Sequence, residues 1–245
     1  MLLLLVLLTL QAVQPVTLKR FEVLRVDRAD IERLPESLRG VFADPSPSAE
    51  AVATADEAAA RAGFTPRLLK STDKLEFGVT DSFKGQATIH IDELNAALRN
   101  ANASDIAIPQ EWDGVEITIQ QGSGILADYG GFFITQAPPL TLTVPSGFPL
   151  DRFMEAIFRV LGVNAMEASK LRERFAANPA AFFPIGTRYE MDIHEVRLNS
   201  GSGTILQNAD KIGEMAFAWS TADRSYFITG QLTEAQVIEI ANSIQ

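Results

Sequence analysis

The chain contains no cysteine, and this absence removes a class of chemistry. Without thiols there are no disulfides, no thiolate nucleophiles and no cysteine-ligated zinc or iron–sulfur sites. Histidine is also scarce: a catalytic triad or histidine-rich metal site would have to use His90 or His194. Neither lies in a G-x-S-x-G or H-E-x-x-H context. We therefore expect no enzyme activity, no cofactor and no metal site.

Positive charge is the second scarce feature. The 21 Lys and Arg residues face 31 Asp and Glu residues, which gives a formal net charge of −10. A negative field opposes nucleic-acid phosphates, whose protein partners normally carry a basic patch, so we expect no nucleic-acid partner. The hydrophobic share of 47% is ordinary for a folded globular protein, and 245 residues favour one large domain as the starting expectation.

An apolar run of full membrane-spanning length is missing as well. The run MLLLLVLLTL, which Ala12 and Val13 extend, covers roughly a dozen residues, whereas a span needs about 20. A signal peptide would have a positive region before this run and small residues at a cleavage site, and neither is evident. Lys19 and Arg20, the nearest positive charges, lie on the carboxyl side, where the positive-inside rule alone favours a cytoplasmic body.

We interpret residues 1–14 as a truncated transmembrane or signal-anchor helix whose upstream cytoplasmic part is missing. The expected localisation is the cytoplasmic membrane, single-pass, with the main domain extracytoplasmic. The alternative is a core helix of a cytosolic protein, which would normally show a polar face. Residues 15–50 are expected to form an extracytoplasmic strand, within Val16 to Val26, and a linker around Asp44-Pro45-Ser46-Pro47-Ser48. Residues 51–245 are expected to form a single α+β domain.

Period-two patterns predict a series of strands that is typical of an antiparallel meander. The predicted strands cover residues 74–80, 86–92, 115–120, 132–136, 140–144, 188–198, 203–207, 214–220 and 225–229.

Helical periods and capping signals predict the helices. Thr54 and Glu57 have capping-box spacing before an Ala-rich helix that Gly63 would end, and a short helix is expected around residues 93–100. A helical hairpin follows, with Asn164 capping its second helix. The apolar stripe of its first helix comprises Leu150, Phe153, Met154, Ile157, Phe158 and Leu161. Thr233 and Gln236 predict a capping box at the start of the last helix.

Two patterns bear a superficial likeness to ligand sites. Gly122-Ser123-Gly124 with Ala127 has the G-x-G-x-x-A spacing of dinucleotide-binding proteins, but no helix is predicted after it, so we favour a glycine hairpin. Glu190, Asp192 and His194 share one face of a predicted strand and are of the residue types that bind divalent cations. Because the other face is apolar, we interpret the trio as the solvated side of a half-buried strand.

The strand that carries Trp219 allows two interpretations. Met215, Phe217 and Trp219 alternate with alanines, which is typical of a strand that faces a packed core. The same side chains could line a lipid-binding cavity, and the sequence alone does not separate a filled interior from a hollow one.

The carboxyl-terminal region carries a recurring pattern of a tryptophan strand, a tight polar turn, an aromatic strand that ends in Gly, and a capped helix. Its segments are 217–220 (FAWS), 226–230 (YFITG), 232–233 (LT) and 241–244 (ANSI). This pattern resembles the extracytoplasmic carboxyl-terminal domain of bacterial membrane-anchored anti-sigma-factor-like proteins. Residues 18–26, 54–64 and 160–171 resemble the corresponding parts of such proteins more weakly.

The resemblance implies a cytoplasmic part that binds a sigma factor, one membrane helix and an external sensing domain. It also implies an α+β fold with a curved, mainly antiparallel β-sheet and helices packed on one face, similar to lipoprotein carriers and preceded here by a partial transmembrane helix. We expect a non-catalytic, membrane-tethered extracytoplasmic sensor or regulatory domain. Its expected partners are a sigma factor, through the missing cytoplasmic part, an envelope protein or lipid ligand, and the membrane. The alternative is a periplasmic lipid or lipoprotein carrier, and an envelope hydrolase has only scattered Ser, Asp and His residues in its favour.

Overall fold

The computed structural model describes residues 12–39, 48–70, 75–187, 190–199, 201–208 and 214–244. Within these ranges the chain is an α+β protein with fourteen strands in three sheets and seven α-helices. The helices are α1 (Arg28–Glu32), α2 (Glu36–Arg39), α3 (Ala55–Ala62), α4 (Ile91–Asn100), α5 (Leu150–Val160), α6 (Ala165–Ala177) and α7 (Glu234–Ser243), with a 3-10 helix at Gln110–Trp112.

The largest sheet has eight strands in the order β11-β12-β13-β14-β8-β7-β4-β3, and every neighbouring pair is antiparallel. A second, antiparallel sheet has the order β1-β9-β6-β5. The strands are β1 (Val13–Thr17), β3 (Ala49–Val52), β4 (Glu76–Thr80), β5 (Phe83–Thr88), β6 (Glu116–Gln121), β7 (Gly124–Asp128), β8 (Phe132–Ala137), β9 (Thr141–Pro145), β11 (Met191–Leu198), β12 (Gly201–Asn208), β13 (Glu214–Ser220) and β14 (Ser225–Gln231).

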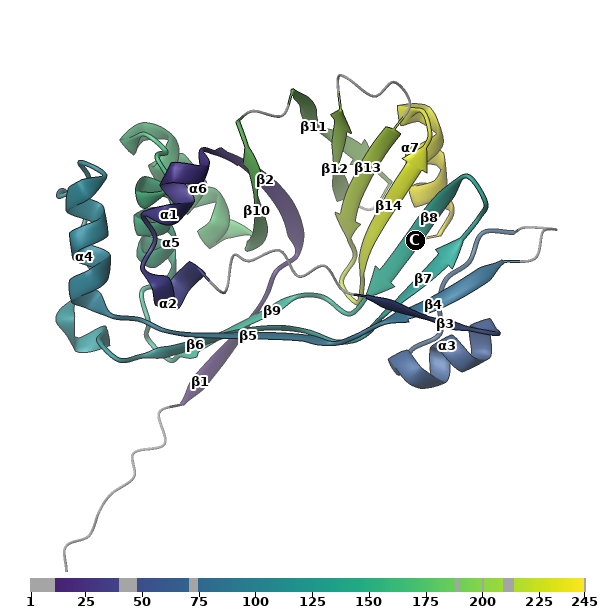
Figure 1. Ribbon diagram of the computed structural model, residues 1–245, viewed down its shortest axis with the longest axis horizontal. Coiled ribbons are helices and arrows are strands. Elements are labelled where there is room, and N and C mark those ends of the chain that lie inside the picture. The colour runs from purple at the N-terminus through teal and green to yellow at the C-terminus, as the bar shows by residue number, and fades with distance from the viewer. Residues whose placement is uncertain are drawn as a thin grey trace, which may run out of the picture.

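The two antiparallel sheets are joined by three long strands that bend in the middle. Strand β4 continues into β5, β6 into β7, and β8 into β9, with only residues 81–82, 122–123 and 138–140 between them. The bends lie at the same level because Thr80 pairs with Gly124 on one side of them and Phe83 pairs with Gln121 on the other. In Figure 1 the four-stranded sheet forms a floor from which the eight-stranded sheet rises as a wall.

A third sheet consists of β2 (Arg20–Val26) and β10 (Ala180–Gly186), which pair in parallel and are called the ribbon below. The ribbon lies between the helices α5 and α6 and the large sheet (Figure 1). Strand β10 contains Pro184, which donates no backbone hydrogen bond. A proline is tolerated at this position because β10 pairs only with β2 in the described part of the chain.

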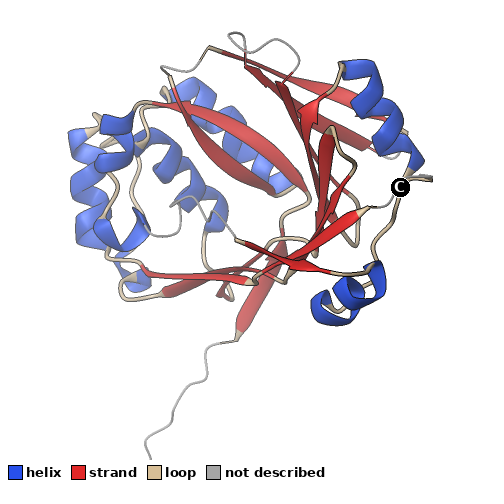
Figure 2. Cartoon of the chain, turned by 45° about the vertical axis from the view of Figure 1, so that its right-hand side comes forward, coloured by secondary structure: helices blue, strands red, loops and turns tan. Residues whose placement is uncertain are grey.

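The buried side chains form separate clusters on the two sides of the bends. One cluster joins the floor to α4, α5, α6 and the ribbon, with Phe158 packed against Phe182 at a ring distance of 4.7 Å. Two smaller clusters cover one face of the large sheet, one under α7 and one under α3. Figure 2 shows the helices gathered at the two ends of the molecule accordingly. A single long strand therefore contributes apolar residues to two cores. Ile117, in β6, belongs to the cluster on the floor, and Ile125, in β7, belongs to the cluster under α3.

The expected α+β class with a mainly antiparallel sheet is confirmed. The helical hairpin is present as α5 and α6, and the side chain of Asn164 accepts the backbone N–H of Glu167 at 3.0 Å. The expectation of helices on one face is too simple: α3 and α7 cover one face of the large sheet, whereas α4 to α6 pack on the floor. This second core exists because the three long strands bend and carry apolar residues on both sides of the bend.

The amino-terminal predictions are tested only in part. Most of the expected membrane helix, residues 1–11, and most of the expected linker, residues 40–47, lie outside the described residues. Val13 and Gln14, assigned to that helix, belong to β1, which pairs with β9. None of the described helices is long and apolar enough to cross a membrane.

The stretch 15–50, expected as a strand and a linker outside the domain, is packed into the body in its described part. Strand β2 pairs with β10, and Leu24, Val26, Leu34 and Leu38 are buried in the same cluster as α5. The helices α1 and α2 were not predicted there because both are very short and α2 follows a proline. The strand predicted over 86–92 ends at Thr88, and α4 begins at Ile91.

Candidate functional site

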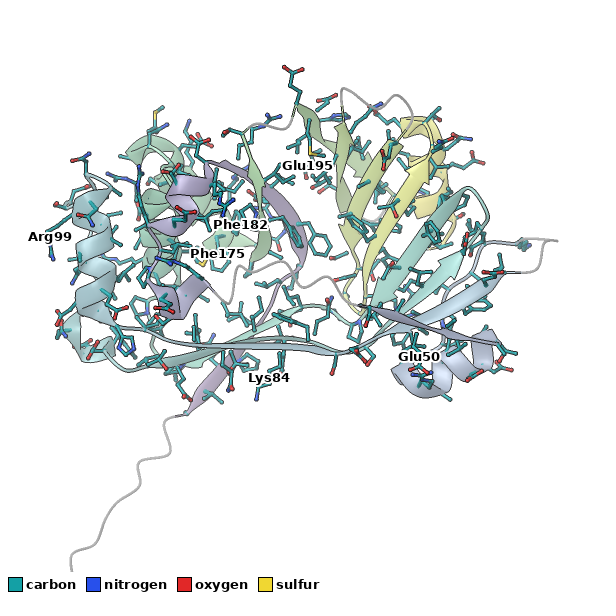
Figure 3. The ribbon with its side chains drawn as sticks, in the orientation of Figure 1. Glu50, Lys84, Arg99, Phe175, Phe182 and Glu195 are labelled. Carbon is teal, nitrogen blue, oxygen red and sulfur yellow. The ribbon has the colours of Figure 1, made fainter. Side chains whose placement is uncertain are left out.

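The described residues form a cleft of about 190 Å³ between β2 and the large sheet. Its ribbon wall includes Phe21 and Val23, and its sheet wall includes Glu195, Thr204 and Ala218. Figure 3 places Glu195 between the ribbon and the sheet, on the edge strand β11. The cleft therefore lies where the helical end of the molecule meets the wall.

The sheet wall belongs to a face that no described helix covers. This open face carries the alternate residues that pair across the sheet in register, namely Ile193, Glu195, Thr204, Leu206, Ala216, Ala218, Phe227, Thr229, Phe133, Thr135, Leu126, Asp128 and Glu76. The opposite, covered face carries residues such as Phe217, Ile228 and Ile134, which are buried under α7. Side chains alternate between the two faces because the side-chain period of a strand is two.

Two polar contacts bridge the cleft. The Thr204 hydroxyl donates to the backbone carbonyl of Phe21 at 2.9 Å. Farther along β2, the Arg25 guanidinium donates to the backbone carbonyl of Met191 on β11. Both contacts join a side chain to a backbone carbonyl, so the ribbon and the sheet are not one continuous hydrogen-bonded ladder. The ribbon is consequently attached more weakly to the sheet than the strands of the sheet are to one another.

Charges at the rim of the cleft are mostly neutralised within the ribbon side. The largely buried Glu22 carboxylate contacts the guanidinium of Arg20, and its other oxygen lies 3.2 Å from Nη2 of Arg174 on α6. Nε of Arg20 also donates to the carbonyl of Asn178 at 3.3 Å. The attraction of two guanidiniums offsets part of the free-energy cost of removing this carboxylate from water. The group ties β2 to α6 rather than presenting free positive charge.

The walls also carry exposed aromatic side chains. Phe183 of β10 is 45% exposed and lies 5.5 Å from the Phe21 ring, centroid to centroid. On the open face, Phe227 and Phe133 are 42% and 41% exposed. Exposed apolar groups that gather on one surface indicate an interaction site rather than a random surface pattern. The cleft itself is smaller than the 300–1,000 Å³ typical of small-molecule pockets, so the arrangement favours docking of a partner over enclosure of a ligand.

The trio Glu190, Asp192 and His194 forms no metal centre. Nδ1 of His194 lies 3.4 Å from Asp192, and its Nε2 lies 3.1 Å from Glu234 at the start of α7. In the described part of the chain, no group of three or more His, Asp or Glu side chains is placed to hold a metal ion. Partial burial would lower the pKa of His194, but hydrogen bonds to Glu234 and Asp192 and their charges raise it above its ordinary value. The imidazole therefore ties α7 to the edge strand.

The Gly122-Ser123-Gly124 segment is neither a phosphate loop nor the hairpin we expected. It is the bend between β6 and β7, and the strand continues where a dinucleotide fold would begin a helix. Gly124 donates its N–H to the Thr80 hydroxyl at 2.9 Å, and a Cβ there would lie 2.8 Å from that oxygen. The glycine is needed because the strands approach each other closely at the bend.

The strand with Trp219 faces a filled core. Trp219 is 1% exposed and stacks between Phe217 and Tyr226, with ring distances of 5.1 and 4.6 Å. Met215 and Phe217 are buried in the same cluster under α7. His90, the other histidine, immediately precedes α4, where its carbonyl accepts the N–H of Leu94.

The open face and its phenylalanines were missed in the sequence. A signal was present: Phe132-Phe133 and Tyr226-Phe227 each place aromatic side chains on both faces of a strand. A strand with only one face in a core would normally be polar on the other. Comparisons with protein-family models, curated proteins and solved structures find no match to this chain.

Proposed function

We propose that the chain is a non-catalytic, extracytoplasmic regulatory domain that is tethered to the cytoplasmic membrane by its amino-terminal apolar run. In this proposal it binds a protein partner or another envelope signal at the cleft. Binding at the cleft changes the conformation of the domain, and this change is transmitted toward the membrane. The observation that carries the proposal is the double role of β2, which follows the apolar run closely in sequence and forms one wall of the cleft.

The path from the cleft to the amino terminus is short and hydrogen-bonded. Strand β1 pairs with β9 of the floor, and the N–H of Leu18, between β1 and β2, donates to Leu140 at 2.9 Å. A displacement of β2 by a bound partner would therefore act on β1 without passing through a flexible linker. The ribbon would have two states, one in which Thr204 and Arg25 make their contacts across the cleft and one in which these contacts are broken. These two states would provide the bistable element that a switch requires.

The family-like carboxyl-terminal pattern supports a regulator of the anti-sigma-factor type, in which a part preceding Met1 would bind a sigma factor. This is tested by the genomic sequence upstream of Met1. A reading frame with a sigma-binding region and a neighbouring sigma-factor gene is the expected result, and a frame that lacks both would count against the sigma-factor partner.

Transcript sequencing in the source bacterium tests the regulatory role. Deletion of the chain and the variant Thr204→Val, which removes one bridge across the cleft, should alter a shared set of transcripts. Thr143→Val, on the outer surface of β9, is the matched control and should leave them unchanged. Unaltered transcripts in the deletion strain would refute a regulatory function.

Localisation has its own test. Protease added to cells whose outer permeability barrier is opened should degrade the domain while the cytoplasmic membrane stays intact. Protection until the membrane is lysed would place the domain in the cytoplasm and refute the proposed tether geometry.

The alternative, a lipid or lipoprotein carrier, is favoured by the exposed phenylalanines of the open face. The filled core around Trp219 weighs against a cavity behind that strand. Native mass spectrometry of the purified chain distinguishes the two: bound acyl species support the carrier, and their absence supports the regulator.

A further inference from the structure

The free edge of β2 is the first of three features that point to one kind of partner. Within the described residues, β2 pairs only with β10. The carbonyl of Phe21 points away from β10, because it accepts the Thr204 hydroxyl. Alternate residues of a strand direct their backbone groups to the same edge, so the N–H and C=O groups of Val23 and Arg25 point there too. An unpaired strand edge is a template for another extended chain.

Apolar surface next to this edge is the second feature. Phe227 and Phe133 lie on neighbouring strands of the open face, where Phe227 pairs with Thr135 and Phe133 with Thr229. Paired residues project to the same side, so the two rings share one surface. Phe183 adds an exposed apolar side chain on the ribbon, next to Val23, with which it pairs and which lines the cleft.

Charge is the third feature. In the two rows of the open face that hold Phe227 and Phe133, the charged residues are Glu195, Asp128 and Glu76. The side chains of all three lack an ion-pair partner in the described ranges, although Asp128 accepts the N–H of Gly130. The chain as a whole carries a net charge of −10. One cation, Arg197, lies on the same face two positions from Glu195, so the three carboxylates outnumber it. The surface is therefore complementary to a cationic partner and repels acidic ones.

From these features we infer that the open face and the free edge of β2 together bind an extended segment of a partner protein that carries apolar residues interspersed with Lys or Arg. The segment displaces the Thr204 hydroxyl from the Phe21 carbonyl, which opens the cleft, and adds a strand to β2. It packs its apolar side chains on Phe227 and Phe133 and places its cations near Glu195 and Asp128. Strand addition of this kind takes affinity from backbone hydrogen bonds and specificity from alternate side chains. The inference deepens the proposed function, on which it rests for the partner's regulatory role.

Calorimetric titration of the full chain with defined peptides tests the inference. The probe is a synthetic peptide of about ten residues that alternates lysine with valine and phenylalanine, a length suited to strand addition. One comparison peptide has glutamate in place of lysine, and another has alternate backbone nitrogens methylated to remove their N–H donors. The lysine peptide should bind saturably, and both comparison peptides should bind at least about tenfold more weakly.

Variants locate the binding surface. Phe227→Ser should weaken binding of the lysine peptide by about tenfold or more, because an aromatic anchor is lost from an exposed position. Met166→Ser, an equally conservative loss of an exposed apolar side chain on α6, is the control and should change affinity by less than about twofold. Unchanged melting temperatures establish that both variants fold, and slowed amide exchange at Val23 and Arg25 would report pairing with β2.

Several outcomes would overturn the inference: equal binding of all three peptides, affinity unchanged by Phe227→Ser, or no peptide binding with Phe227-dependent binding of phosphatidylcholine vesicles. The last would assign the open face to lipid. Peptide binding without any transcript change on deletion would refute the regulatory function but leave the open face assigned as a peptide-binding surface. A transcript change on deletion without peptide binding would refute only the assignment of that surface.

Discussion

At the scale of single residues, Gln136 has an unusual position for a polar side chain. It is 1% exposed, on the covered face of the large sheet, and its amide exchanges two hydrogen bonds with the backbone of Arg67, at 2.9 and 2.7 Å. The Arg67 guanidinium in turn donates to the Tyr226 hydroxyl and to Asp223. These bonds hold the extended segment 64–70 on the sheet where no strand pairs with it.

Replacement of Gln136 by Leu should therefore be costly. The N–H and C=O of Arg67 lose their partners, and two unsatisfied backbone groups should lower the free energy of unfolding by roughly 2–4 kcal/mol. Urea denaturation measures this loss. Gln120→Leu, at an exposed position of β6, is the control. A Gln136→Leu variant as stable as the wild type would show that segment 64–70 is held by other contacts.

His194 provides a prediction about pH. Its pKa is raised in the folded state because the hydrogen bonds and charges of Glu234 and Asp192 outweigh the effect of partial burial. The stabilisation by protonated His194 is thus fully present below its unfolded pKa of about 6.5 and is lost as pH rises through the raised folded pKa. The stability difference between wild type and His194→Gln should shrink as pH rises from about 6.5 through the raised folded pKa.

Urea denaturation across that range measures the effect, with His90→Gln as the control for general pH dependence. A difference that stays constant with pH would mean that His194 is not protonated more readily in the folded chain. Because the side chain is 37% exposed, added salt should reduce the difference by screening.

At the scale of elements, α7 illustrates how a short helix is specified locally. Thr233 accepts the N–H of Gln236 at 3.3 Å, and the Gln236 side chain accepts the N–H of Thr233 at 2.8 Å, which confirms the predicted capping box. Leu232 and Val237, spaced as a hydrophobic staple, are both buried. The cap matters here because α7 covers the Trp219 strand and carries Glu234, the partner of His194.

Removal of the cap by Thr233→Ala should cost about 1 kcal/mol of stability, since an orphan N–H at the helix start loses its acceptor. Glu239→Ala, an exposed change within the same helix, serves as the comparison and should be nearly neutral. Thermal denaturation of the three proteins checks the order. Equal stability of both variants would mean that packing alone positions α7.

At the scale of the whole molecule, the bends of the three long strands divide the interior. The cluster around α5 and the clusters under α3 and α7 share strands but are separate groups of buried side chains. The ribbon belongs to the first cluster through Leu24 and Val26 and meets the large sheet across the cleft. The fold can thus loosen on one side of the bends while the other side stays packed.

Phe158→Ala tests this division. Phe158 is 1% exposed and packs against Phe182, so its truncation should cost about 3–5 kcal/mol. Hydrogen exchange should accelerate in α5, α6 and the ribbon much more than in β13. An equal increase in β13 would mean that the clusters unfold as one cooperative unit.

How much of the fold and of the candidate site could be predicted depends on how far apart in the sequence the residues of each pattern lie. Strand β13, from Glu214 to Ser220, and the α5 stripe were predicted correctly because alternation and helical period are local patterns. Strand β10 was not predicted, since its sequence AAFFPIG lacks alternation and contains a proline. Of the candidate site, Glu195 and Phe227 were placed on strands, but nothing in their own segments indicated that they face the ribbon.

The sequence by itself determined the α+β class, most strands, the helical hairpin and the cap of α7, because each depends on residues a few positions apart. Only the tertiary structure decided that β2 pairs with β10, some 160 positions away, and that Phe183 therefore lies next to Val23 of the cleft wall. It also decided which aromatic residues are buried and which are exposed: Trp219 lies under α7, whereas Phe227 lies on a face that no described helix covers. Exposure depends on what packs against a side chain, and that partner is brought there by the fold of the entire chain.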